Sequence, residues 1–119
     1  MGLVLVVDDM FFEREWVGGV LMREGHAVVE ATNGSEALTM IDEQHPDCIL
    51  TDLSMPEMDG LQLLGTLHAR GNRIPIIVLS SDRQSETREE CERLGARAVL
   101  RKSWDRGELW DALKDALPR

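Results

Sequence analysis

Short apolar runs alternate along this chain with longer segments in which apolar residues recur at helical spacing. Runs of this kind are typical of strands that are covered on both faces of a parallel sheet. They occupy residues 3–7, 27–31, 47–52, 76–79 and 97–100. The segments between and after them predict helices at residues 12–23, 34–43, 60–69, 85–94 and 105–117.

This alternation predicts the fold class. Strands that alternate with helices at this spacing are joined by right-handed crossovers, which give a parallel sheet with helices on both faces. A chain of 119 residues with 43% hydrophobic content can build one core of ordinary size. We therefore expect one α/β domain over residues 1–119, with no effector domain in this chain.

Local signals set several of the predicted helix ends. Asn33 with Glu36 three residues later resembles an N-terminal capping pattern, and His45-Pro46 is expected to stop the helix that follows. The inner face of the first helix is predicted from the apolar stripe Trp16, Val17, Val20 and Leu21.

Charge and composition narrow the function classes. The formal net charge of −9 disfavours direct binding of nucleic acid, which depends on lysines and arginines at phosphates. No apolar run approaches the roughly 20 residues of a membrane span, and no signal-peptide pattern is present. Cys48 and Cys91 form no CxxC pair, which favours free thiols in a reducing compartment. We expect a cytoplasmic protein.

Chemically capable residues gather at the predicted strand ends. Asp8-Asp9 follows the first strand, Asp52 ends the third, Ser80 ends the fourth and Lys102 follows the fifth. In a parallel sheet these ends meet at one edge, where open α/β sheets bind their ligands. Singly, a strand-end aspartate is more often a helix cap and a lysine a surface charge. The placement of all these residues at one edge of the sheet favours a functional site there.

The composition of this predicted site suggests phosphoryl transfer. Clustered carboxylates repel one another unless a cation or raised pKa values relieve the repulsion. A set of oxygen ligands without Cys or His suits Mg²⁺. With the cation bound, one carboxylate could attack phosphorus and form an aspartyl phosphate, while Lys102 and Ser80 bind oxygens of the transferred group.

These residues, in this order, resemble a known family. The chain resembles the receiver domain of two-component response regulators, the chemotaxis regulators among them, over about residues 3–117. The matching motifs are Asp8-Asp9, Asp52 with Met55-Pro56-x-Met58-Asp59-Gly60, Ser80, and Gly95-Ala96 leading to Lys102. The resemblance implies a flavodoxin-like (βα)5 three-layer sandwich with a five-stranded parallel sheet in the order 2-1-3-4-5.

The resemblance also implies a function. Asp52 would be the phosphoacceptor, and Mg²⁺ would be held by Asp9 with Asp8 assisting, by Asp52 and by the backbone carbonyl of Ser54. The phosphodonor would be a phosphohistidine on a sensor histidine kinase or histidine phosphotransfer protein. The chain would signal through altered contacts with a downstream protein target. It would catalyse only its own phosphorylation and dephosphorylation.

Further roles follow by position within the family pattern. Ser80 would be the switch hydroxyl and Lys102 would pair with the phosphoryl group. Ser54 and Asp82 occupy the positions that tune dephosphorylation. Val99 stands at the switch position where the family usually has Tyr or Phe.

Two departures keep an alternative open. Val99 removes the usual aromatic readout, and Ser103 replaces the proline that commonly follows the lysine, so the loop bearing Lys102 is expected to sit differently. A phosphorylation-independent, receiver-like protein-binding module is therefore the alternative. A phosphatase of the haloacid-dehalogenase kind is disfavoured, because such enzymes carry a second acid two residues after the nucleophile and this chain has Ser54 there.

One apolar segment has no place in this chemistry. Met10, Phe11 and Phe12 follow the acidic pair at the start of the first helix. Three large apolar side chains in a row cannot all point inward from one helix. We expect an exposed pair here to suit a helical phosphodonor.

Overall fold

A computed structural model of the chain describes residues 2–53, 55, 58–80, 85–101 and 106–117. The predictions for Ser54, Asp82, Lys102 and Ser103 fall outside these residues.

Strands and helices alternate through the described residues, as the sequence predicts. They are β1 (Leu3–Val7), α1 (Phe11–Arg23), β2 (Ala27–Ala31), α2 (Gly34–Gln44), β3 (Cys48–Asp52), α3 (Gly60–Ala69), β4 (Ile76–Ser80), α4 (Ser85–Arg93), β5 (Ala98–Arg101) and α5 (Arg106–Ala116). The predicted bounds are right to within one or two residues. β4 extends to Ser80, so this hydroxyl lies on the strand itself.

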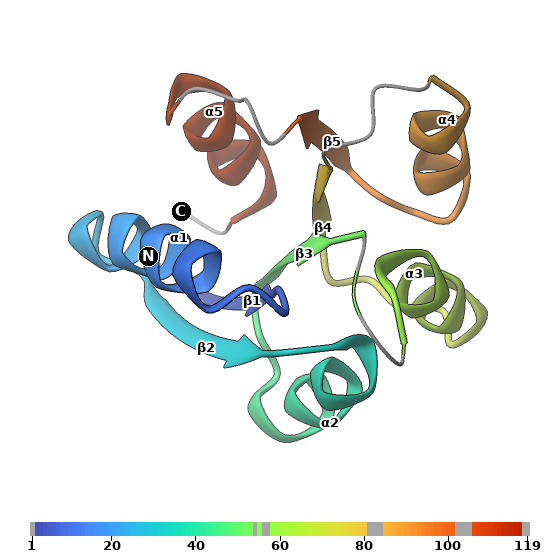
Figure 1. The fold of residues 1–119 in the computed structure, drawn as a ribbon, viewed down its shortest axis with the longest axis horizontal. Helices are drawn as coiled ribbons and strands as arrows, with labels where there is room; N and C mark the ends of the chain where they lie inside the picture. Colours follow the sequence, from blue (N-terminus) through green and yellow to red (C-terminus); the bar gives the residue numbers. More distant parts are fainter. Residues whose placement is uncertain (1, 54, 56–57, 81–84, 102–105, 118–119) are drawn as a thin grey trace.

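The strands form one parallel sheet in the order β2-β1-β3-β4-β5. Helices α1 and α5 cover one face of the sheet, and α2, α3 and α4 cover the other (Figure 1). The predicted three-layer α/β sandwich and its strand order are therefore confirmed.

Two apolar cores lie on opposite faces of the sheet. Successive residues of a strand point to opposite faces, so a strand covered on both sides supplies both cores. On β3, Ile49 packs beneath α2, α3 and α4, whereas Leu50 packs beneath α1 and α5. Every residue of β3 and β4 is buried. Asp52 therefore ends a strand whose position is fixed by apolar packing on both faces.

Capping fixes the starts of two helices. The Asn33 side chain accepts a hydrogen bond from the backbone N–H of Glu36 at 2.8 Å, as predicted for α2. Asp59 and Gln62 form a reciprocal capping box at the start of α3. At the other end of α2, His45 adopts a left-handed conformation with φ of 51° and stops the helix.

Helix α1 departs from its predicted inner face. Val17, Val20 and Leu21 are buried, but Trp16 is 51% exposed. Trp16 lies about 100° around the helix from Val17, at the edge of the buried stripe. Large apolar side chains on and beside this first part of α1 are exposed, and we call them the α1 apolar surface: Met10, Phe11, Phe12 and Trp16.

Candidate functional site

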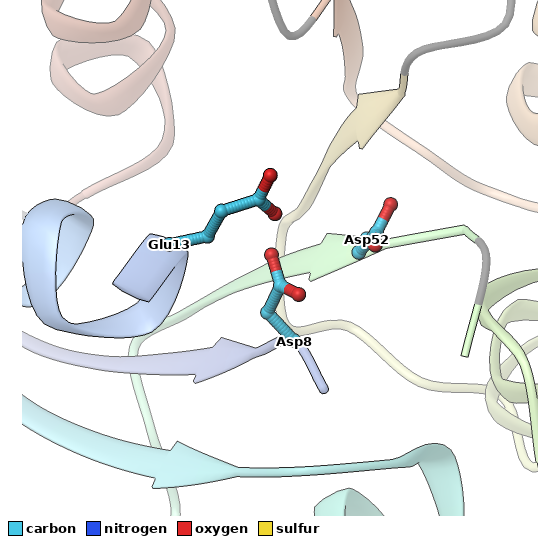
Figure 2. A group of neighbouring side chains, drawn as sticks. All are labelled: Asp8, Glu13 and Asp52. Carbon is cyan, nitrogen blue, oxygen red and sulfur yellow. The ribbon is translucent and has the colours of Figure 1, made fainter. Parts of the chain in front are cut away.

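Three carboxylates converge at the carboxyl edge of the sheet. Asp8 follows β1, Asp52 ends β3, and Glu13 belongs to the first turn of α1 (Figure 2). One carboxylate oxygen from each lies within 4.8 Å of the others. Asp8 and Asp52 are only 6% and 5% exposed, and Glu13 is half-buried.

Backbone contacts hold Asp8 in place. Its N–H donates to the Ala31 carbonyl at 3.1 Å, which continues the pairing between β1 and β2. Its Oδ1 accepts a hydrogen bond from the Met10 N–H at 2.9 Å. Its carbonyl accepts one from Nη1 of Arg14 at 2.8 Å, and Nε of Arg14 donates to Glu30 on β2 at 3.1 Å. Asp8 is thus tied to both α1 and β2.

Asp52 is held from its own strand and from the turn after it. The Leu53 N–H donates to Oδ1 of Asp52 at 2.8 Å, and the hydroxyl of Thr51 donates to the Asp52 carbonyl at 2.8 Å. The Gly60 N–H then donates to the Leu53 carbonyl at 2.9 Å, which brings the start of α3 against the end of β3.

Ser80 lies at the same edge of the sheet as Asp52. β4 is the neighbour of β3, and Asp52 pairs with Leu79 in the strand register. Ser80 is the next residue and is 3% exposed. The sequence prediction that the carboxylates and this hydroxyl share one edge is therefore confirmed for Asp8, Asp52 and Ser80.

Val99 lies two strands from Asp52, on β5. It pairs with Val78 of β4, is half-buried and packs against the core beneath α2, α3 and α4. Its carbonyl accepts a hydrogen bond from Nη2 of Arg88 on α4 at 3.1 Å. The position that usually carries an aromatic ring is thus filled by a small apolar side chain and is linked to α4 through the backbone.

Two acidic residues lie where the sequence does not predict them. Asp9 is exposed and lies outside the group formed by Asp8, Glu13 and Asp52. Its role as a metal ligand stays a prediction. Glu13 was missed by the sequence analysis. A carboxylate in the first turn of the helix that follows an acidic strand end was the available signal, because that turn begins at the same sheet edge.

The donor set suits a hard divalent cation. All three groups offer carboxylate oxygens, the ligand type that Mg²⁺ and Ca²⁺ prefer, and no sulfur or imidazole belongs to the group. Mutual repulsion among three carboxylates, two of them buried, favours a bound cation. The pocket of Asp8, Glu13 and Asp52 could therefore bind a metal ion.

Comparison with known proteins agrees with this geometry. The response regulator receiver domain family matches residues 4–114. The chain is 31% identical to sporulation initiation phosphotransferase F of Bacillus subtilis over 115 residues, which cover 97% of this chain and 93% of that protein. It is 32% identical to the chemotaxis protein CheY of Listeria monocytogenes over 114 residues, which cover 95% and 96% of the two chains.

Structural comparison gives the same answer. The receiver domain of the Francisella response regulator 1452 superimposes with a TM-score of 0.92 at 28% identity, covering 98% of this chain and 96% of that one. Among the described residues, no helix has the length and apolar character that a membrane crossing requires. The chain belongs to the response regulator receiver domain family, the phosphoacceptor domains of two-component signalling.

Proposed function

We propose that Asp52 is the phosphoacceptor of this receiver and that it takes its phosphoryl group from a phosphohistidine with Mg²⁺ in the acidic pocket. One observation carries the proposal: Asp52 ends a fully buried central strand with its carboxylate within 4.8 Å of those of Asp8 and Glu13. A buried nucleophile beside a divalent-cation site is the arrangement that carboxylate phosphorylation requires.

The proposed reaction is a simple displacement. A carboxylate oxygen of Asp52 attacks the phosphorus, the bond between phosphorus and the donor's imidazole nitrogen breaks, and the imidazole leaves with the bonding electron pair. The product is an acyl phosphate on Asp52. Such transfers need positioning and charge neutralisation more than covalent help from the protein.

Each neighbouring residue has a defined part in this proposal. Asp8, Asp9, Asp52 and the backbone carbonyl of Ser54 would hold Mg²⁺. When bound, the cation supplies charge neutralisation for the phosphoryl oxygens. Ser80 would hydrogen-bond one of these oxygens as the switch hydroxyl, and Lys102 would pair with another.

The donor class follows from the family, and the α1 apolar surface supports it. Receiver domains take phosphoryl groups from sensor histidine kinases or histidine phosphotransfer proteins. Phe11 and Phe12 are 58% and 81% exposed, and they share the first turn of α1 with Glu13. An apolar surface beside the acidic pocket suits a donor that presents its histidine on an apolar helical face.

The remaining features complete the proposal. The chain would catalyse only its own phosphorylation and dephosphorylation at Asp52, tuned by Ser54 and Asp82, and it would signal through altered protein contacts. Cys48 and Cys91 are both free and buried, which supports the predicted reducing location in the cytoplasm.

Intact-mass spectrometry after incubation with acetyl phosphate and Mg²⁺ tests the reaction. We expect one phosphoryl adduct on the wild type and none on Asp52→Asn or in the presence of EDTA. Asp42→Asn, which alters an exposed carboxylate on α2, is the matched control and should still be labelled. Absence of any adduct on the wild type would overturn the proposal in favour of the phosphorylation-independent binding module.

A further inference from the structure

Glu13 is part of the acidic pocket although the receiver pattern assigns it no role. One of its carboxylate oxygens lies within 4.8 Å of a carboxylate oxygen of Asp8 and of Asp52 (Figure 2). It enters from α1, whereas the aspartates come from strand ends. The pocket is thus formed by two strand-end aspartates together with Glu13 from helix α1.

The start of α1 explains why Glu13 faces the pocket. Glu13 is the third residue of the helix, a position from which a glutamate commonly reaches back to the N–H of the capping residue. Here that residue is Met10, whose side chain offers no cap and whose N–H donates to Oδ1 of Asp8 at 2.9 Å. Asp8 therefore accepts the hydrogen bond that a glutamate at the third helical position commonly accepts.

The corresponding glutamate of α2 shows the contrast. Glu36 is also the third residue of its helix, and its carboxylate accepts hydrogen bonds from the backbone N–H and the hydroxyl of Thr32. The Glu36 carboxylate therefore lies at the start of its own helix. The Glu13 carboxylate instead lies among those of Asp8 and Asp52.

Arg14 fixes the turn that carries Glu13. Its guanidinium bridges the Asp8 carbonyl and the Glu30 carboxylate, and its side chain is only 13% exposed. This clamp joins the first turn of α1 to the ends of β1 and β2. The position of Glu13 is therefore set by the same contacts that set the position of Asp8.

We propose that Glu13 is a further cation-binding residue of this receiver, which binds the metal directly or through a coordinated water and raises the affinity of the unphosphorylated site. The inference rests on the Mg²⁺ site of the proposed function and deepens it. Proteins usually give Mg²⁺ one or two carboxylates, and an added negative charge in a partly buried site strengthens cation binding. The pocket, with three carboxylates, should bind Mg²⁺ more tightly than the two aspartates do alone.

Calorimetric titration of the full chain with Mg²⁺ alone tests this inference. Glu13→Gln keeps the size of the side chain and removes its charge. Glu15→Gln removes the same charge from an exposed position two residues along the same helix, and it is the matched control. We expect Glu13→Gln to weaken binding about 10- to 100-fold, the usual cost of losing a residue that supports a metal site, and Glu15→Gln to weaken it far less.

Thermal unfolding with and without Mg²⁺ gives a second readout. At the same high Mg²⁺ concentration, the rise in Tm should be smaller for Glu13→Gln than for Glu15→Gln. A ligand at a given concentration stabilises the folded state more the more tightly it binds. Equal affinities and equal Tm shifts in the two variants would overturn the role of Glu13.

Asp8→Asn separates this inference from the proposed function. If Asp8→Asn loses Mg²⁺ while Glu13→Gln matches Glu15→Gln, the receiver site stands and the inference on Glu13 is wrong. If the wild type itself binds no Mg²⁺, the metal component of the proposed function fails, and the inference fails with it.

Discussion

Gly60, the first residue of α3, packs directly on the backbone of Asp52. A β-carbon at Gly60 would lie 2.3 Å from the Asp52 carbonyl oxygen and 2.7 Å from the Cα atom of Leu53. Both neighbours are main-chain atoms, one at the buried end of β3 and one in the residue after it, and they cannot give way as a flexible side chain can. The glycine of the Asp59-Gly60 motif is thus a requirement of close packing behind Asp52, the proposed phosphoacceptor.

Gly60→Ala should therefore impair both stability and phosphorylation. Relief of the clash must push α3 away from β3 or displace Asp52, and overpacking of this kind costs about 1–3 kcal/mol. We expect a lower free energy of unfolding in urea and slower labelling by acetyl phosphate. Gly65→Ala lies in the same helix with nothing within 4 Å of the new methyl group, and it should raise stability slightly. Equal stability of the two variants would contradict this account.

Arg14→Lys should weaken metal binding by the acidic pocket although it changes none of the pocket's three carboxylates. Arg14 reaches the Asp8 carbonyl with Nη1 and Glu30 with Nε, and the single ammonium of lysine cannot reproduce this fork. We expect a loss of about 1–3 kcal/mol in the free energy of unfolding and weaker Mg²⁺ binding. Arg23→Lys, in the last turn of the same helix, is the control and should change neither quantity.

The fold was predictable because its determinants are local and repeated. Each buried strand appears as a short apolar run, and each crossover helix appears between two such runs. Capping by Asn33 and the stop at His45 are encoded within a few residues. The convergence of Asp8, Asp52 and Ser80 then follows from parallel strand direction alone, since all the strands end at the same edge.

Glu13 could not be predicted in the same way. Periodicity assigns it to a helix, but whether its carboxylate meets Asp8 depends on where the first turn of α1 sits relative to the strand ends. That placement is set by the contacts of Arg14 with the Asp8 carbonyl and with Glu30, which belongs to a different strand sixteen residues along the chain. The exposure of Trp16 has a similar origin, because an apolar residue at the edge of a stripe is buried only where a neighbouring element reaches it.

The α1 apolar surface should affect phosphoryl transfer from a protein donor and leave phosphorylation by a small-molecule donor unchanged. Phe12 is 81% exposed, so Phe12→Ser should leave the free energy of unfolding nearly unchanged. Labelling by acetyl phosphate should stay at the wild-type rate, while phosphoryl transfer from a purified histidine phosphotransfer protein or sensor kinase should slow. Met22→Ser, 60% exposed near the other end of α1, is the control. Equal transfer rates for both variants would argue against donor docking here.

Cys48 should make the stability of the domain fall at alkaline pH. Burial raises the pKa of this thiol from its ordinary value of 9.0 to about 12. Above pH 9 the unfolded chain therefore loses this proton while the folded chain keeps it, so the free energy of unfolding declines as the pH rises from 9 toward 12. Below pH 9 the thiol is protonated in both states, and the stabilisation is fully present.

Cys48→Ala isolates this contribution. The chain has no tyrosine, which removes one common source of alkaline titration, and Cys91 is present in both proteins. Urea unfolding from pH 7 to pH 10.5 should show a smaller loss of stability with pH for Cys48→Ala than for the wild type. At pH 7 the variant should be the less stable of the two, because it lacks the buried sulfur. Parallel curves would mean that the Cys48 thiol ionises equally in the folded and unfolded states. In that case the end of β3 that lies away from Asp52 would be open to water, contrary to the burial of Cys48 in this structure.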